Sequence, residues 1–143
     1  RRGREALAAT GAITTPHIID AGDGVRLQGL HTALPGREPR ALALLLHGWE
    51  GSAESSYMQL TAAQLVTRGF EVFRLNFRDH GDTHHLNEGL FHSNRIDEVV
   101  AAAAEVARRH GVLQIGDKLL TLNLGDLGDD ARLNGQRVKR RRV

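Results

Sequence analysis

The feature that most constrains the fold is an unbroken apolar run that ends in a glycine-rich segment. Residues 41–46 read Ala-Leu-Ala-Leu-Leu-Leu, and His-Gly-Trp-Glu-Gly follows at residues 47–51. A short run without a polar residue is typical of a strand that is buried on both faces, as in parallel sheets covered by helices. The glycines let the chain turn sharply just after that strand. The sequence therefore predicts an α/β protein with exposed backbone at the end of a central strand.

Periodicity predicts the neighbouring elements. Residues 17–30 hold two short apolar stretches around Ala-Gly-Asp-Gly, a pattern that indicates a β-hairpin. Beyond the apolar run, helices are predicted at 57–68 and 95–109, on either side of a strand at 70–75. Alternation of strands and helices after a hairpin predicts a mixed, mostly parallel sheet with flanking helices.

The two ends of the chain carry weaker patterns. Residues 1–16 are expected to be loosely ordered, and residues 17–124 to form the α/β domain. Residues 118–124 are strand-like, and an Asn-Gly pair further on is a hairpin signal. One strand with a tail and two short hairpins are both compatible with residues 112–143. Residues 125–143 are therefore assigned to an uncertain basic tail.

Composition narrows the class of protein. Apolar residues make up 41% of the 143 residues and charged residues 25%, an ordinary soluble balance. No apolar run approaches the ~20 residues that span a bilayer, so no membrane association is expected and the expected location is cytoplasmic. The absence of cysteine excludes disulfides and thiolate catalysis. The chain is short for a complete domain of the predicted type and does not begin with Met, so we expect a fragment, a processed product or an engineered form.

Basic residues crowd both ends of the chain, although its formal net charge is only +2. The densest group occupies residues 137–142. Such a run can contact nucleic acid through phosphates. No aromatic side chain is interleaved with these charges, however, and a solvated tail is the favoured interpretation. Nucleic acid is not expected as a partner.

Three segments carry a resemblance to a known family. Leu-Leu-Leu-His-Gly-Trp-Glu-Gly-Ser at 44–52 is similar to a strand followed by an HGxxG-type loop, and Phe-Arg-Leu-Asn-Phe-Arg-Asp-His-Gly at 73–81 is similar to an N-F-R-x-x-G segment. A third segment reads Phe-His-Ser at 91–93 and Ile-Asp-Glu-Val-Val at 96–100. It resembles the start of the helix that precedes the nucleophile strand of the family. Residues 41–109 thus resemble the N-terminal half of the α/β-hydrolase superfamily, near its esterase and acyltransferase-like branch. The resemblance implies a truncated α/β-hydrolase-like core, acting on a small acyl ester or thioester without a cofactor.

The resemblance also assigns roles in the glycine-rich loop. Trp49 corresponds to a residue whose backbone N–H is one donor of the oxyanion hole, and Gly48 gives the loop its turn. One such donor contributes about 2.7–4 kcal/mol to lowering the barrier of acyl transfer. His47 is expected to orient the loop rather than to act as a base, and Arg78 to brace the second segment by pairing with Asp79 or Asp82. A tight strand-to-helix loop without a catalytic role is the alternative.

The nucleophile is missing from its expected place. The family holds its serine in Gly-x-Ser-x-Gly, and none of the serines has that context; they are Ser52, Ser55, Ser56 and Ser93. Asp126 lies near the nucleophile position, where a carboxylate serves in dehalogenase-like relatives, but a surface turn is favoured there. The chain leaves no room for a later acid and histidine. We therefore expect an incomplete triad and an inactive chain, or alternatively a non-catalytic scaffold that self-assembles through an exposed sheet edge.

Histidines gather in the second half of the matched region, at His80, His84, His85 and His92. Histidine with neighbouring aspartate can bind zinc or nickel, but this spacing matches no fixed ligand pattern. No metal site is therefore expected. The Gly22-x-Gly24 pair does not indicate dinucleotide binding either, because it joins two antiparallel strands and opens no helix.

Overall fold

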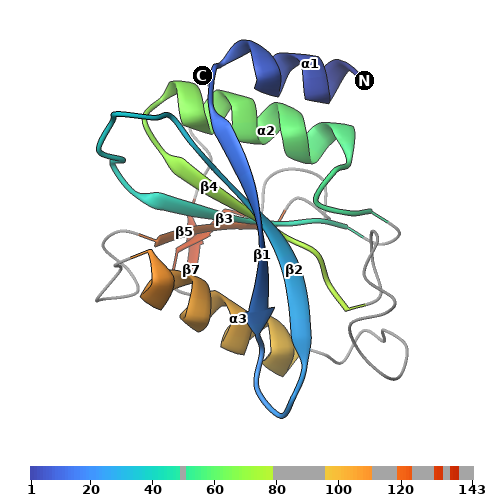
Figure 1. Ribbon diagram of the computed structural model, residues 1–143. Helices are drawn as coiled ribbons and strands as arrows, with labels where there is room; N and C mark the ends of the chain where they lie inside the picture. The colour runs from blue at the N-terminus through green and yellow to red at the C-terminus, as the bar shows by residue number, and fades with distance from the viewer. Residues whose placement is uncertain (49–50, 79–95, 111–118, 124–130, 134–135, 139–143) are drawn as a thin grey trace.

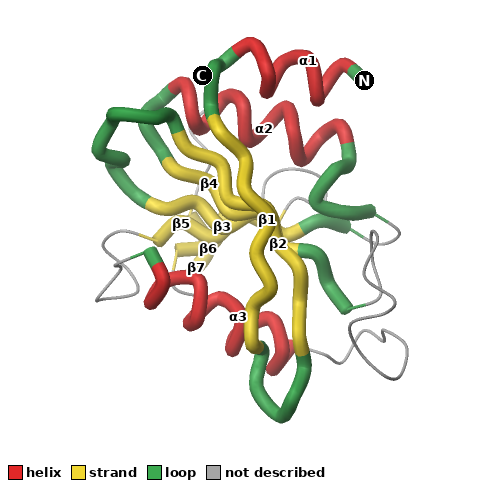
Figure 2. The backbone as a smooth tube through the Cα atoms, viewed as in Figure 1, coloured by secondary structure: helices red, strands yellow, loops and turns green. Residues whose placement is uncertain are grey.

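The computed structural model describes residues 1–48, 51–78, 96–110, 119–123, 131–133 and 136–138. Three helices and seven strands lie in these residues (Figures 1 and 2). In chain order they are α1 (Arg2–Ala9), β1 (Ile13–Asp20), β2 (Arg26–Ala33), β3 (Leu42–Leu46), α2 (Ser56–Thr67), β4 (Glu71–Leu75), α3 (Ile96–Arg109), β5 (Leu119–Asn123), β6 (Ala131–Leu133) and β7 (Gln136–Val138).

The strands form one sheet in the order β1-β2-β4-β3-β5-β6-β7. Its central strands β4, β3 and β5 are parallel, as predicted, and β3 is buried along its whole length. The expectation of a mostly parallel sheet needs correction, because the described strands make two parallel pairings and four antiparallel ones. Parallel neighbours need long crossovers, which here carry α2 and α3. Three antiparallel pairs, β1–β2, β5–β6 and β6–β7, join consecutive strands by short connections, and the fourth is made by β2, which lies antiparallel to β4.

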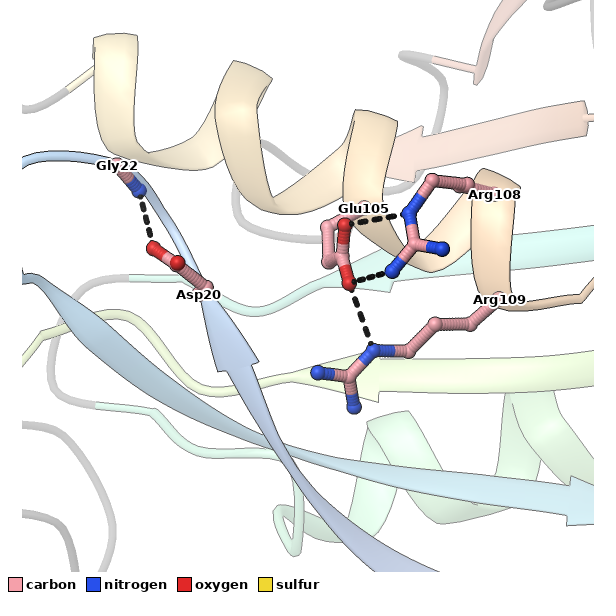
Figure 3. A network of polar contacts seen from close by, with 5 residues as sticks. All are labelled: Asp20, Gly22, Glu105, Arg108 and Arg109. Carbon is pink, nitrogen blue, oxygen red and sulfur yellow. Dashed lines mark hydrogen bonds and ion pairs between the residues drawn. The ribbon is translucent and has the colours of Figure 1, made fainter.

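The β1–β2 hairpin is closed by a turn that the sequence pattern indicates. The Asp20 carboxylate accepts a hydrogen bond from the Gly22 N–H at 2.9 Å, which fixes the start of the turn (Figure 3). Gly22, Asp23 and Gly24 all have positive φ angles, of 83°, 50° and 75°. Glycine adopts this region freely, and aspartate tolerates it better than most other residues.

Helices cover both faces of the sheet. Figure 1 shows α1 and α2 on one face and α3 on the other. The α3 face buries the larger apolar cluster, which includes Ile19, Leu27, Leu44, Phe73 and Val106. The opposite face buries a second cluster, which includes Leu7, Leu45, Met58, Val66 and Val72. Among the described residues, no helix has the length and apolar character needed to cross a membrane.

The N-terminal segment differs from its expectation. Residues 1–16 were expected to be loosely ordered, but they contain α1 and the start of β1. α1 packs on α2 through Leu7, which is buried, and through Gly3. A Cβ atom at Gly3 would lie 2.7 Å from the backbone oxygen of Ser56, so glycine allows this close approach. Little in the sequence signals this helix, because Arg1 at its N-cap is not a capping residue type and no side chain caps its first turn.

The C-terminal region contains more structure than a tail. β5 confirms the predicted strand at residues 118–124 and pairs with β3. β6 and β7 lie within the presumed tail 125–143 and pair antiparallel, with Leu133 opposite Gln136. Two intervening residues fit the hairpin signal of the Asn-Gly pair. The strand-like stretch 112–115 lies outside the described residues.

Acid should weaken a charge cluster at the end of α3. Glu105 pairs with Arg108 and Arg109 at 2.6 and 2.9 Å (Figure 3), and these hydrogen bonds lower the pKa of Glu105 to about 2. A lowered folded-state pKa stabilises the fold above the unfolded-state value, and that contribution disappears as pH falls from about 4.3 toward 2. We expect Glu105→Gln to flatten this part of the pH profile of the urea midpoint. The difference in urea midpoint between the two proteins should shrink in 1 M salt, because the cluster is at the surface. Equal pH profiles for the parent and Glu105→Gln would contradict the proposed contribution of Glu105.

Candidate active site

Strand order creates a topological switch point at the carboxyl ends of β3 and β5. The chain runs from β3 to β4 on one side, and then crosses to β5 on the other side of β3. In doubly wound sheets, ligands bind outside the carboxyl ends of the strands at such a switch point. Leu46 and Asn123 are paired at those ends, and the segment that begins at His47 leaves the sheet there. The glycine-rich loop therefore starts at the position where this architecture places a site.

His47 joins the ends of two strands. Its side chain is buried, and its Nε2 accepts a hydrogen bond from the Phe77 N–H at 3.0 Å. An acceptor nitrogen carries no proton, so the proton is on Nδ1, which lies 2.8 Å from the Gly48 carbonyl oxygen and donates to it. Both ring nitrogens are thus engaged with backbone. This geometry orients the loop and leaves neither nitrogen directed at a substrate.

The glycines bring the loop against the start of α2. The Gly48 N–H donates to the Tyr57 hydroxyl at 2.8 Å, and the Gly51 N–H donates to the Gly48 carbonyl at 3.0 Å. A Cβ atom at Gly51 would lie 2.5 Å from the Tyr57 hydroxyl oxygen. A side chain at position 51 would therefore have to displace the Tyr57 hydroxyl, which accepts the Gly48 N–H. Sequence reasoning missed Tyr57, because its local pattern is that of an ordinary residue in the first turn of a helix. Nothing in that pattern indicates a hydrogen bond to the preceding loop.

Two polar side chains from β4 and the residue after it hold the far side of the loop. The Ala53 N–H donates to the Asn76 side-chain oxygen at 2.7 Å, and the Arg74 guanidinium donates to the Ala53 carbonyl at 2.9 Å. Both side chains are buried. Burial lowers the pKa of Arg74, and the charge of Glu54 opposes that shift. The N–H and the carbonyl of Ala53 are thus both hydrogen-bonded, to side chains of β4 and of the residue that follows it.

Internal bonds engage every loop amide that the structure describes from Gly48 to Ser55. In addition to those above, the Ser52 N–H donates to the Ser55 hydroxyl and the Glu54 N–H to the Ser52 hydroxyl. The Ser55 N–H donates to the Ser52 carbonyl. Two of the serines therefore brace the loop. Trp49 and Glu50, between Gly48 and Gly51, lie outside the described residues.

A buried ion pair follows β4. The Arg78 guanidinium donates to both carboxylate oxygens of Glu98, near the start of α3, with Nε at 3.3 Å from one of them. The side chains are 7% and 11% exposed, so water screens the pair poorly. Sequence analysis gave Arg78 a bracing role but named Asp79 or Asp82 as its partner. Those two residues lie outside the described residues, and the partner in the described chain is Glu98.

The other residues singled out in the sequence, Asp126 and the histidines at 80, 84, 85 and 92, lie outside the described residues. Two surface hollows lie beside the end of α1, away from this loop. A group of histidines with Glu71, which sequence reasoning missed, lies at the opposite end of β4 from His47.

Solved structures identify the fold. Esterase Pf2001 of Pyrococcus furiosus matches 81% of this chain with a TM-score of 0.63 and 18% identity, and the match covers 43% of the esterase. XC6422 of Xanthomonas campestris, described as an α/β serine hydrolase without a lid, matches 77% with a TM-score of 0.60 and 20% identity, over 50% of its own length. The fold is that of the α/β hydrolases.

The resemblance expected for residues 41–109 is thereby confirmed at the level of the fold, and the match extends well beyond that segment. Esterase Est22, another α/β-hydrolase structure, has a TM-score of 0.65 and 12% identity over 84% of this chain and 37% of its own. The chain spans half or less of the length of these three structures. No protein-family model matches the chain, and no curated protein matches its sequence.

Proposed function

We propose that this chain carries the oxyanion-loop part of an esterase-type site, for acyl ester or thioester substrates. The supporting observation is the braced loop at the switch point, whose described amides are all engaged internally. A rigid loop with few uncommitted N–H groups is the geometry that stabilises a developing oxyanion, because its donors need no reorganisation during the reaction. In this proposal Trp49 supplies the donor, and His47 and Gly48 fix the path of the loop.

The nucleophile and base are proposed to lie outside the residues that make this loop. His47 cannot take a proton from a serine in the observed geometry, because Nε2 already accepts the Phe77 N–H. The hydroxyls of Ser52 and Ser55 each accept a backbone hydrogen bond within the loop. Asp126 remains a weak nucleophile candidate by its position after β5. We therefore propose that the chain by itself does not turn over esters.

The first test is hydrolysis of p-nitrophenyl acetate and butyrate by the purified chain, with a fluorophosphonate probe alongside. We expect neither turnover above the blank nor covalent labelling. The sample must show cooperative unfolding, so that lack of reaction reports on chemistry rather than on loss of structure. Stoichiometric labelling of one serine, located by peptide mass spectrometry, would overturn the claim that the chain lacks a nucleophile.

The oxyanion assignment needs a positive test. Residues 1–123 can be joined to the part of the Xanthomonas campestris serine hydrolase that follows its corresponding strand. A folded chimera should be labelled by the probe and hydrolyse the esters. Gly51→Ala in it should lower kcat, by up to the roughly 100-fold that loss of one oxyanion donor costs, because the added Cβ displaces the loop that carries the proposed Trp49 donor. Gln64→Ala, at an exposed position on α2, is the matched control. If Gly51→Ala left the kcat of a folded, active chimera unchanged, the proposed role of the loop would be refuted.

Asn76→Ala should destabilise the fold through this same loop. It removes the acceptor of the buried Ala53 N–H, and an unsatisfied buried donor costs about 1–3 kcal/mol. Urea denaturation should show a lower midpoint with an unchanged slope. Gln28→Ala is the control: it removes only the longer, partly buried bond to the Asn76 amide at 3.3 Å, and should cost less. Equal losses in the two variants would contradict this explanation.

The alternative is a non-catalytic scaffold that self-associates through its sheet edge. β1 is an edge strand, and it exposes Ile13 and Ile18, at 59% and 42%. Exposed apolar edge strands favour pairing between chains. Light scattering during gel filtration over a range of concentrations tests this proposal. A dimer that Ile13→Lys or Ile18→Lys disperses would support the scaffold; a monomer throughout would remove it.

A further inference from the structure

Two histidines and a glutamate converge at the amino end of β4, away from the oxyanion loop. His31 Nε2 lies 3.2 Å from a Glu71 carboxylate oxygen, and the His31 and His110 rings stack with centroids 4.2 Å apart. One potential ligand atom from each of the three residues lies within 4.8 Å of the other two. All three are partly buried. The group thus combines close spacing with limited access to water.

The fold produces this convergence from distant parts of the chain. His31 on β2 is paired with Phe73 on β4, and Glu71 lies two residues earlier on β4. Alternate residues of a strand share a face, so the two side chains are diagonal neighbours on one face of the sheet. His110 follows the last residue of α3, the helix that covers that face. No local sequence spacing could have indicated the group, because its members come from three separate elements.

One nitrogen of the group has no partner in the described structure. His110 Nε2 is buried and has no hydrogen bond to any described residue. A buried polar atom without a partner is costly and calls for an explanation, such as a bound ion. The Glu71 carboxylate, which pairs with His31, does not bond this nitrogen either. His110 Nε2 is therefore available to coordinate an ion.

The chemistry of the three side chains suits a cation. Imidazole nitrogen and carboxylate oxygen are both ligand types that zinc accepts, so the group offers two nitrogens and one oxygen within a short distance of one another. Arg109, the nearest basic residue along the chain, is paired with Glu105.

We propose that His31, Glu71 and His110 form a zinc-type metal site that ties the end of α3 to β2 and β4. Two histidines and one carboxylate are an established zinc ligand set, with water in the fourth position. Ligand atoms around a tetrahedral zinc at bond lengths of about 2.1 Å lie roughly 3.4 Å apart, so small side-chain rotations would close the present spacing. His17 packs edge-on to His31, with ring centroids 6.0 Å apart, and shields the site without being one of the three ligands.

The site is separate from the proposed esterase site. Glu71 is the first residue of β4, whereas Leu75, its last residue, pairs with Leu46 just before the oxyanion loop. The metal therefore takes no part in acyl transfer, and its effect is on folding. A ligand that binds the folded state but not the unfolded state raises the apparent stability of the chain by mass action. Binding can consequently be measured without reference to any enzymatic activity.

The test uses the full chain with the other histidine cluster removed. Replacing His80, His84, His85 and His92 by Gln eliminates competing imidazoles. The chelator-treated protein is then titrated with Co²⁺, followed by visible absorption, and with Zn²⁺, followed by calorimetry and Tm. We expect one equivalent bound per chain, a tetrahedral Co²⁺ spectrum and a Tm that rises with Zn²⁺ concentration. No spectrum and no rise in Tm would refute the site.

Ligand variants decide which residues bind. In the same background, Glu71→Gln, His31→Gln and His110→Gln should each weaken Zn²⁺ binding by more than the roughly 10–100-fold that loss of an outer partner costs. His17→Gln is the matched control and should change it less than tenfold. Three ligand positions protect the test against one variant that fails to fold. Binding retained in every folded ligand variant would overturn the assignment.

Discussion

Glu98→Gln is expected to lower the free energy of unfolding by about 3–5 kcal/mol, the range measured when one partner of a buried ion pair is removed. The substitution keeps the shape of the side chain but removes the carboxylate charge that faces the buried Arg78 guanidinium in this ion pair. Removal of the charge matters more than loss of the hydrogen bonds, because a buried cation has little access to water. Urea denaturation at neutral pH measures the difference.

Two controls separate burial from charge. Glu105→Gln removes a carboxylate from the same helix, but its partner Arg108 is 71% exposed, so the loss should be a small fraction of that at Glu98. The double variant Arg78→Met/Glu98→Leu removes both charges and should recover much of the stability, because an apolar pair can replace a buried ion pair. A double variant no more stable than Glu98→Gln would show that the charges themselves are not responsible.

The pair also matters for the candidate site. Arg78 follows β4 closely, and the N–H of the neighbouring Phe77 donates to His47. Glu98 therefore ties this segment to α3, while Asn76 and Arg74 tie it to the loop after β3. Loss of Glu98 should consequently loosen the backbone that orients His47. Faster hydrogen exchange of the Phe77 amide in Glu98→Gln would report this effect directly.

Local patterns were enough to predict the centre of the fold. The apolar run at 41–46, the glycine that ends α2 and the acidic first turn of α3 each depend on neighbours in the sequence. The predicted helices and strands agree with α2, α3, β3 and β4 to within one or two residues. Such signals arise from periodic burial, which the chain carries in its own order of residues.

Contacts made across the fold were not predictable in this way. α1 has one large apolar side chain, Leu7, and is held by its packing on α2. The order of strands at the edges of the sheet depends on pairings between distant segments. One partner of Arg78, Glu98, lies twenty residues away on a helix. Tyr57, Glu71 and His110 gain their roles from register and helix placement. A single sequence carries no periodic signal for such pairings.

Phe73→Ala should cost about 3–5 kcal/mol, as expected for truncating a fully buried aromatic side chain. Its ring fills the space beside Gly29 on the neighbouring strand: a Cβ atom at Gly29 would lie 2.0 Å from the ring. The glycine and the ring are diagonal neighbours, because Phe73 is paired with His31 and Gly29 with Leu75. Aromatic cover of a strand glycine is a recognised stabilising arrangement.

The two positions should therefore be strongly coupled. In the parent chain Gly29→Ala forces the ring to move, which should cost about 1–3 kcal/mol through overpacking. In the Phe73→Ala background the same change fills part of a cavity and should be neutral or stabilising. The coupling free energy from the double-mutant cycle should therefore be about 1 kcal/mol or more, within the range of about 0.5–3 kcal/mol that contacting residues show. Because Gly29 has no positive φ, backbone strain cannot account for its loss. Additive free energies in the cycle would mean that Gly29 is required for some reason other than the ring, and the close approach of Phe73 would then not explain the glycine.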